Sequence, residues 1–162
     1  MLNSTENKDY LFLPMCYLYR NGIELALKRI LIEDCKIDYR SATRIISRKK
    51  HSILGLWNSI KSEIEEHSNA PSGDTTIQDV EFYINQLHNI DQTSDKFRYP
   101  VNKDLQFHFT REQIYSISNF AKCFKELFAF LDAVDGMLSY IRDIESEMES
   151  EMRNYYSDYN NY

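Results

Sequence analysis

Apolar residues recur at helical spacing over most of this chain, and this periodicity restricts the fold more than any other feature. From residue 110 onward the steps of three and four residues continue for about eight turns, through Ile114, Ile117, Ala121, Phe124, Phe128, Leu131 and Leu138. Such spacing is typical of a helix that buries one face. Only four glycines and three prolines occur in 162 residues, so few positions break a helix. We therefore expect an all-α protein.

The same reasoning predicts helices over 9–34, 52–66 and 75–90, with loops at 68–74 and 91–104. Capping boxes that start at Thr75 or Thr76 and at Thr110 are expected to open the last two helices. The segment 105–109 alternates and predicts a short extended stretch, whereas 36–50 is interpreted as a solvated connector with at most a helical turn. These elements make an up-and-down bundle of four to five helices over residues 1–144. Residues 145–162 form an acidic, Tyr- and Asn-rich extension that we expect to fray from Asn154.

Composition excludes several classes of protein. The formal net charge of −6 argues against a wholly basic nucleic-acid binder, although it leaves room for a local basic patch. Three widely spaced cysteines give no zinc signal and fit free thiols in a reducing compartment. No apolar run is long enough to span a membrane, and no metal or cofactor motif stands out. We expect a cytoplasmic protein without metal, cofactor or membrane attachment.

Three polar clusters lie within apolar surroundings. Arg20, Glu24 and Lys28 follow one another at four-residue steps along the first helix, His51 opens the second, and Arg98 is framed by aromatic residues before Pro100. Arg20, Glu24 and Lys28 could form a ladder of ion pairs along the helix. Alternatively, Glu24 could pair with Arg98 in the protein interior. Alternatively, His51 shifts a proton, Arg20 and Arg98 hold a phosphate, and Glu24 orients an arginine. The residues alone leave scaffold and active site both open.

A basic run lies between the first two predicted helices. Arg44, Arg48, Lys49 and Lys50 could hold an RNA backbone by nonspecific charge, or they could belong to an ordinary solvated linker.

Short motifs in this chain resemble those of the HEPN superfamily of helical bundles. They are Leu18-Tyr19-Arg20-x-x-Ile23-Glu24-Leu25-x-Leu27-Lys28, then His51-x-Ile53-Leu54-x-Leu56-Trp57, and Phe97-Arg98-Tyr99-Pro100. The resemblance covers roughly residues 10–142 and implies a bundle of four or five helices, often dimeric. Active members cut RNA without metal by means of an arginine, four to six residues and a histidine. In this chain a motif with such spacing occurs early, where six residues separate Arg44 from His51.

The resemblance implies a protein of a prokaryotic defence or toxin–antitoxin system that acts on RNA as a metal-independent endoribonuclease. It also implies a homodimer and an antitoxin or defence-system protein as partner. Two alternatives stay open. One is a non-catalytic HEPN-like module that binds RNA, a nucleotide or a partner protein, and the other is a structural helical adaptor.

Overall fold

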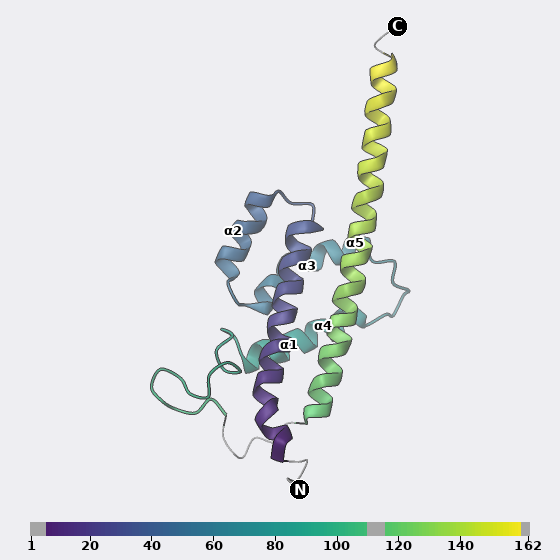
Figure 1. Ribbon diagram of the computed structural model, residues 1–162. Helices are drawn as coiled ribbons and strands as arrows, with labels where there is room; N and C mark the ends of the chain where they lie inside the picture. Colours follow the sequence, from purple (N-terminus) through teal and green to yellow (C-terminus); the bar gives the residue numbers. More distant parts are fainter. Residues whose placement is uncertain (1–5, 110–115, 160–162) are drawn as a thin grey trace.

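The computed structural model describes residues 6–109 and 116–159. Within these ranges the chain is all-helical apart from loops and one isolated antiparallel bridge between Val101 and Phe107, so the predicted all-α class is confirmed. The helices form a bundle (Figure 1) and are α1 Glu6–Glu33, α2 Tyr39–Lys49, α3 Ile53–His67, α4 Thr76–Ile90 and α5 Ile117–Tyr159. None of them is long and apolar enough in its described residues to cross a membrane.

The strongly periodic segments became helices close to their predicted bounds. α3 starts one residue after Ser52, whose Oγ accepts a hydrogen bond from the Gly55 amide at 3.1 Å and so caps the helix. α4 begins differently from the expected capping box. Thr75 Oγ1 donates to the Asp79 carboxylate at 2.9 Å, and the Thr76 amide donates to Asp74 at 2.7 Å. The capping box expected at Thr110 lies outside the described residues.

Two predictions about irregular segments are wrong. Residues 39–49 are a helix, α2, and not a connector, because Asp38 caps its first turn by accepting from the amides of Arg40 and Ser41 at 2.9 and 3.1 Å. The predicted fraying from Asn154 does not occur in the described part of this segment, since α5 runs on to Tyr159. The extended stretch expected at 105–109 is reduced to the single bridge at Phe107.

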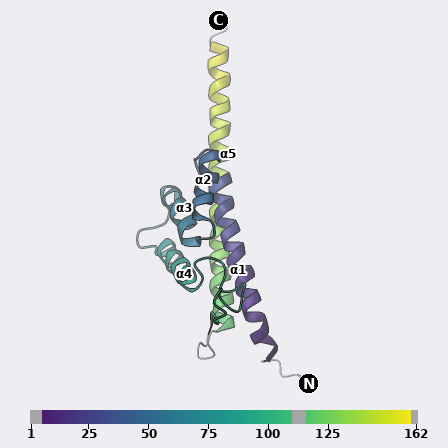
Figure 2. The same ribbon diagram turned by 90° about the vertical axis from the view of Figure 1, so that its left-hand side faces the viewer.

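α1 packs against α3 and α5 (Figures 1 and 2). Its buried face includes Ile23 and Leu27, and Trp57 of α3 is fully buried in the same core. Gly22 of α1 faces the ring of Phe128 so closely that a Cβ built on it would lie 2.5 Å from the ring Cζ. The absence of a side chain at Gly22 therefore allows α1 and α5 to approach each other closely.

The C-terminal part of α5 leaves the bundle. Residues 143–159, here called the stalk, extend past the other helices in both views (Figures 1 and 2). The large apolar side chains of the stalk are consequently exposed, Met148 at 60% and Tyr155 at 66% among them.

Candidate functional site

The junction between α2 and α3 carries the candidate site. Lys50 ends α2 with a positive φ of 51°, His51 follows it, and Ser52 caps α3. This two-helix corner lies over the middle of α1, where Arg20 and Glu24 are one helical turn apart. Residues 31 positions apart in sequence therefore meet here.

Arg20 is fully buried and binds three different segments. Its Nη1 donates to Glu24 Oε2 at 2.9 Å, its Nη2 to the backbone carbonyl of His51 at 2.6 Å, and its Nε to the backbone carbonyl of Asp91 at 3.2 Å. A planar guanidinium suits this task because its donors point in fixed, divergent directions. Since the side chain has no exposed surface, the expected role of Arg20 in holding a phosphate is not compatible with this arrangement. Arg20 ties α1 to the corner and to the loop after α4.

Glu24 is the acceptor at the centre of the cluster. Its Oε1 accepts from Lys28 Nζ at 2.6 Å and lies 2.9 Å from His51 Nδ1, while Oε2 accepts from Arg20. Burial alone would raise the pKa of this carboxyl, but the hydrogen bonds from Lys28, His51 and Arg20 outweigh burial and leave the pKa below its usual value. Glu24 is thus held as a carboxylate.

His51 is the exposed member of the cluster, with 60% of its side chain accessible. Because a carboxylate only accepts hydrogen bonds, the 2.9 Å contact assigns the Nδ1 proton to His51 and directs it at Glu24. The neutral ring then carries its lone pair on Nε2. A histidine oriented by a carboxylate in this way is equipped to take a proton from a bound molecule.

Asp91 completes the cluster, although it was not among the predicted site residues. It is fully buried at the C-terminal end of α4, its Oδ2 lies 3.4 Å from Arg20 Nε, and its Oδ1 accepts from the amides of Asp95 and Lys96 at 3.0 and 3.3 Å. One signal could have pointed to it: an aspartate directly after the last apolar residue of a helix, at the start of a polar loop. With Arg20 and Lys28 against Glu24 and Asp91, the opposite charges of the cluster balance.

Arg98 does not join the cluster. It is exposed, and its Cζ lies 5.7 Å from the centroid of the Tyr17 ring and 5.5 Å from that of Tyr99. The alternative in which Glu24 pairs with Arg98 is therefore wrong, because Glu24 is engaged by Arg20, Lys28 and His51. Arg98 instead stacks on aromatic faces and fixes the loop to α1.

The predicted RNA-binding residues lie in the second half of α2 and at its C-terminal end, with Arg44 and Arg48 on one side of the helix and Lys49 on the side of Ala42, next to Gly55. Arg44, Arg48, Lys49 and Lys50 are exposed, and Arg40 lies one turn before Arg44 on the same side of the helix. None of the ion pairs between described side chains involves these five residues. We call these five residues the basic face; it ends next to His51.

A search of the described residues finds no group of three or more His, Cys, Asp and Glu side chains that could hold a metal ion. Comparison of the chain with protein-family models, with curated proteins and with solved structures gave no significant match. Membership of the HEPN superfamily accordingly stays a prediction.

Proposed function

We propose that this chain binds RNA through the basic face of α2 and cleaves it without metal, with His51 as the group that takes the proton. One observation carries the proposal: a histidine held by a buried carboxylate follows directly on an exposed, unpaired run of cations. The HEPN resemblance supports the same activity and adds a prokaryotic defence or toxin–antitoxin setting, with an antitoxin or similar protein as partner.

Charge explains why nucleic acid suits the basic face. Residues 39–50 contain five cations and no acid, on a chain whose net charge is −6. Cations without ion-pair partners can bind phosphates at little cost, and each phosphate contact releases counterions from the nucleic acid. An acidic protein with one basic face also binds in a single orientation. RNA held along α2 would present its backbone to His51.

The chemistry needs no group other than those of RNA and the protein. His51 Nε2 takes the proton of a ribose 2′-hydroxyl, O2′ attacks the adjacent phosphorus, and the bond from phosphorus to O5′ breaks. O5′ takes a proton from water, and the products are a 2′,3′-cyclic phosphate and a 5′-hydroxyl. In this scheme Glu24 orients His51, Arg44 and Arg48 offset phosphate charge, and Arg20 acts as a positioning residue.

A non-catalytic RNA-binding module is the second candidate, and the burial of Arg20 favours it. With Arg20 enclosed and Arg98 stacked on tyrosines, His51 has no arginine beside it in the cluster that could contact a scissile phosphate. The basic face would then bind RNA, and the cluster would only fix the fold.

A cleavage assay in EDTA separates the two candidates. Purified protein is incubated with a fluorescent single-stranded RNA, next to His51→Ala and to His108→Ala as a matched control on the loop between α4 and α5. We expect cleavage by the wild type and by the control, termini of the cyclic-phosphate type, and loss of at least about a hundredfold in rate for His51→Ala. If all three proteins cleave the RNA equally, His51 is not the catalytic group. If the wild type binds the RNA but does not cleave it, catalysis by His51 is also ruled out.

Binding is measured separately by fluorescence anisotropy over a range of salt. Each cation that contacts a phosphate of single-stranded RNA contributes about 0.7 to the slope of log K against log salt. The variant Arg44→Gln/Arg48→Gln should therefore lower the slope by about 1.4, whereas Lys103→Gln/Arg153→Gln, which removes two exposed cations elsewhere, should leave it unchanged. Equal effects of the two variants would show that net charge alone matters and that α2 is not the binding surface.

A further inference from the structure

The loop after α4 carries large apolar side chains that stand out into solvent. Tyr99 is 50% exposed, Leu105 79% and Phe107 76%, and none of the ring contacts between described residues involves Phe107. We call residues 95–107 the aromatic loop. Exposed apolar side chains gathered on one segment indicate a surface that another molecule covers.

Hydrogen bonds within the aromatic loop fix the shape of its backbone. Asn102 closes the turn, because its Oδ1 accepts from the amides of Asp104 and Gln106, both at 2.9 Å, and its own amide donates to the Gln106 carbonyl at 2.9 Å. Inside this turn Leu105 keeps a positive φ of 60°, a conformation that costs a leucine free energy unless its surroundings impose it. The backbone that carries Phe107 is therefore held before any ligand arrives, so less entropy is lost when one binds.

The start of the aromatic loop is anchored beside the candidate site. Asp91 Oδ1 accepts from the amides of Asp95 and Lys96 at 3.0 and 3.3 Å. The Arg20 guanidinium donates to the carbonyl of Asp91 at 3.2 Å and to that of His51 at 2.6 Å, so one side chain holds both the loop and the corner. Figure 1 shows the aromatic loop and α2 on the same side of α1, and Figure 2 views the molecule from that side. A strand held by the cations of α2 beside His51 thus has the aromatic loop next to it.

We propose that the aromatic loop binds unpaired bases of the RNA whose phosphates the basic face holds, with the rings of Tyr99 and Phe107 as stacking platforms. The inference rests on the RNA binding proposed above and names its substrate class, which is single-stranded RNA. Every base has a flat π face, so stacking on an exposed ring needs no particular sequence, whereas the bases of a duplex are already stacked on one another. Exposed Arg98, whose Cζ lies 5.5 Å from the centroid of the Tyr99 ring, offers a further planar group for a base.

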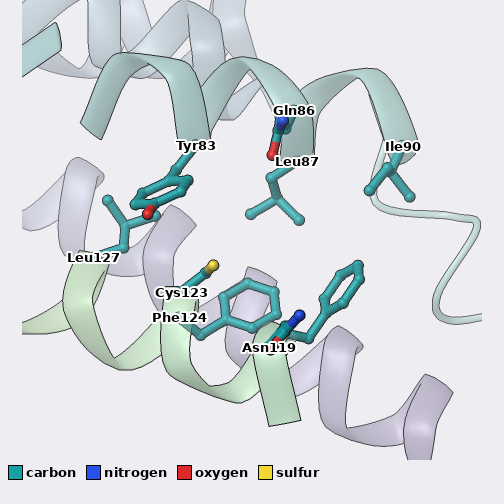
Figure 3. A pocket seen from close by; sticks show the side chains of 9 residues that line it. Tyr83, Gln86, Leu87, Ile90, Asn119, Cys123, Phe124 and Leu127 are labelled. Carbon is teal, nitrogen blue, oxygen red and sulfur yellow. The ribbon is translucent and has the colours of Figure 1, made fainter. Parts of the chain in front are cut away.

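The groove between α4 and α5 is another apolar surface that could take a base. It has a volume of about 210 Å³, and Tyr83, Leu87 and Leu127 lie on its walls (Figure 3). None of its lining residues is charged, so nothing in it attracts the phosphates on either side of a base. The aromatic loop has Arg98 beside its tyrosine and the cations of α2 nearby, and it therefore suits a nucleic acid better.

The proposed cleavage also favours a single strand. O2′ must lie in line with the bond from phosphorus to O5′, and a regular helical backbone holds O2′ away from that line. A base that stacks on the aromatic loop, and not on its neighbour in the strand, leaves the backbone free to turn into the reactive geometry.

Fluorescence anisotropy with three probes tests the inference. The probes are a short 2′-O-methyl RNA strand, whose blocked O2′ prevents cleavage, the same strand in a duplex, and the same strand without its bases. The wild type should bind the complete strand at least about fivefold more tightly than either of the other probes. Phe107→Leu and Tyr99→Leu remove a ring but keep an apolar side chain, so each should weaken binding of the complete strand at least about fivefold. The slope of log K against log salt should stay unchanged in both variants, since no phosphate contact is lost.

Two further variants serve as controls. Phe107→Trp keeps a ring and should bind like the wild type, and Leu105→Ala removes an exposed apolar side chain without a ring from the same loop and should also bind like it. Arg44→Gln/Arg48→Gln should instead lower the salt slope, which tells a lost phosphate contact from a lost stack.

Each outcome decides between the two proposals. If Phe107→Leu binds as tightly as the wild type, or the strand without bases as tightly as the complete strand, the aromatic loop does not stack bases, while RNA binding by α2 stands. Equal losses in Leu105→Ala and Phe107→Leu would show a general apolar contact and overturn the inference as well. If the wild type binds none of the probes, RNA binding itself is wrong and the inference falls with it.

Discussion

Replacement of Arg20 by methionine is the sharpest test of the buried network. The change keeps an unbranched side chain of similar length in the core and removes the guanidinium. It deprives Glu24 Oε2, the His51 carbonyl and the Asp91 carbonyl of their donors at 2.9, 2.6 and 3.2 Å. Asp91, which is fully buried, also loses the cation 3.4 Å from its carboxylate, so the charge balance of the cluster is broken.

The magnitude follows from burial. Removal of one partner from a buried ion pair typically costs about 3–5 kcal/mol, because the remaining charge is left uncompensated in the interior. Two orphaned carbonyls add to this cost, while the amides of Asp95 and Lys96 still stabilise the Asp91 carboxylate and offset part of it. We therefore expect a loss of about 4 kcal/mol. For a chain of this size that corresponds to a fall of roughly 8–16 °C in Tm.

Urea denaturation followed by fluorescence measures the loss. Trp57 is the only tryptophan of the chain and is fully buried, so its emission reports the opening of the core. Arg29→Met is the matched control, because Arg29 also pairs with a glutamate one turn on, Glu33 at 3.0 Å, but with 61% of its side chain exposed. Because the ion pairs of Arg29 with Glu33 and Asp135 are open to solvent, Arg29→Met should cost much less than Arg20→Met. Equal effects of the two substitutions would refute the assignment of Arg20 as a buried organiser.

Three further predictions concern other parts of the fold. Burial and the neighbouring charge of Asp135 raise the pKa of Asp34 to about 6, so the folded chain keeps a proton that the unfolded chain releases, and the contribution of Asp34 to stability should rise as the pH falls from about 7 to about 4. In Asp34→Asn the slope of unfolding free energy against pH over this window should therefore become more positive than in the wild type. Asp38→Ala removes the cap of α2 and should cost about 1 kcal/mol in thermal unfolding, together with a lower affinity for RNA. Gly22→Leu should force α1 and Phe128 apart and cost about 1–3 kcal/mol by urea titration, whereas no loss would contradict the close approach.

The four helices with regular apolar spacing were predictable, because burial of one face imposes a period that survives in the sequence. α2 was missed because its dense positive charge is typical of a solvated linker. Its start was nevertheless encoded: Asp38 stands as an N-cap, and Ala42, Ile45 and Ile46 follow at helical spacing on the inner side. A short helix with a narrow apolar stripe is difficult to recognise from its sequence when polar residues cover the rest of its surface.

The site was predictable only where its contacts are local. Arg20 and Glu24 are four residues apart on one helix, so their ion pair follows from helical geometry. The contact of His51 with Glu24 depends on how the corner between α2 and α3 returns to α1, and no local pattern encodes that path. Asp91 joins from a loop 71 residues away from Arg20, and Arg98 is drawn to Tyr17 instead. Contacts between distant segments are set by packing, which a single sequence does not display.

The network also explains how an exposed histidine can be held in one orientation. His51 lies on the surface at a helix junction, where a side chain is usually free to rotate. Here α1 fixes the residue twice: Arg20 binds its backbone carbonyl, and Glu24 binds its ring at Nδ1. The two anchors are themselves joined to each other at 2.9 Å, so neither moves without the other. The entropy lost in ordering His51 is therefore paid on folding, so the ring is already oriented before any molecule reaches it.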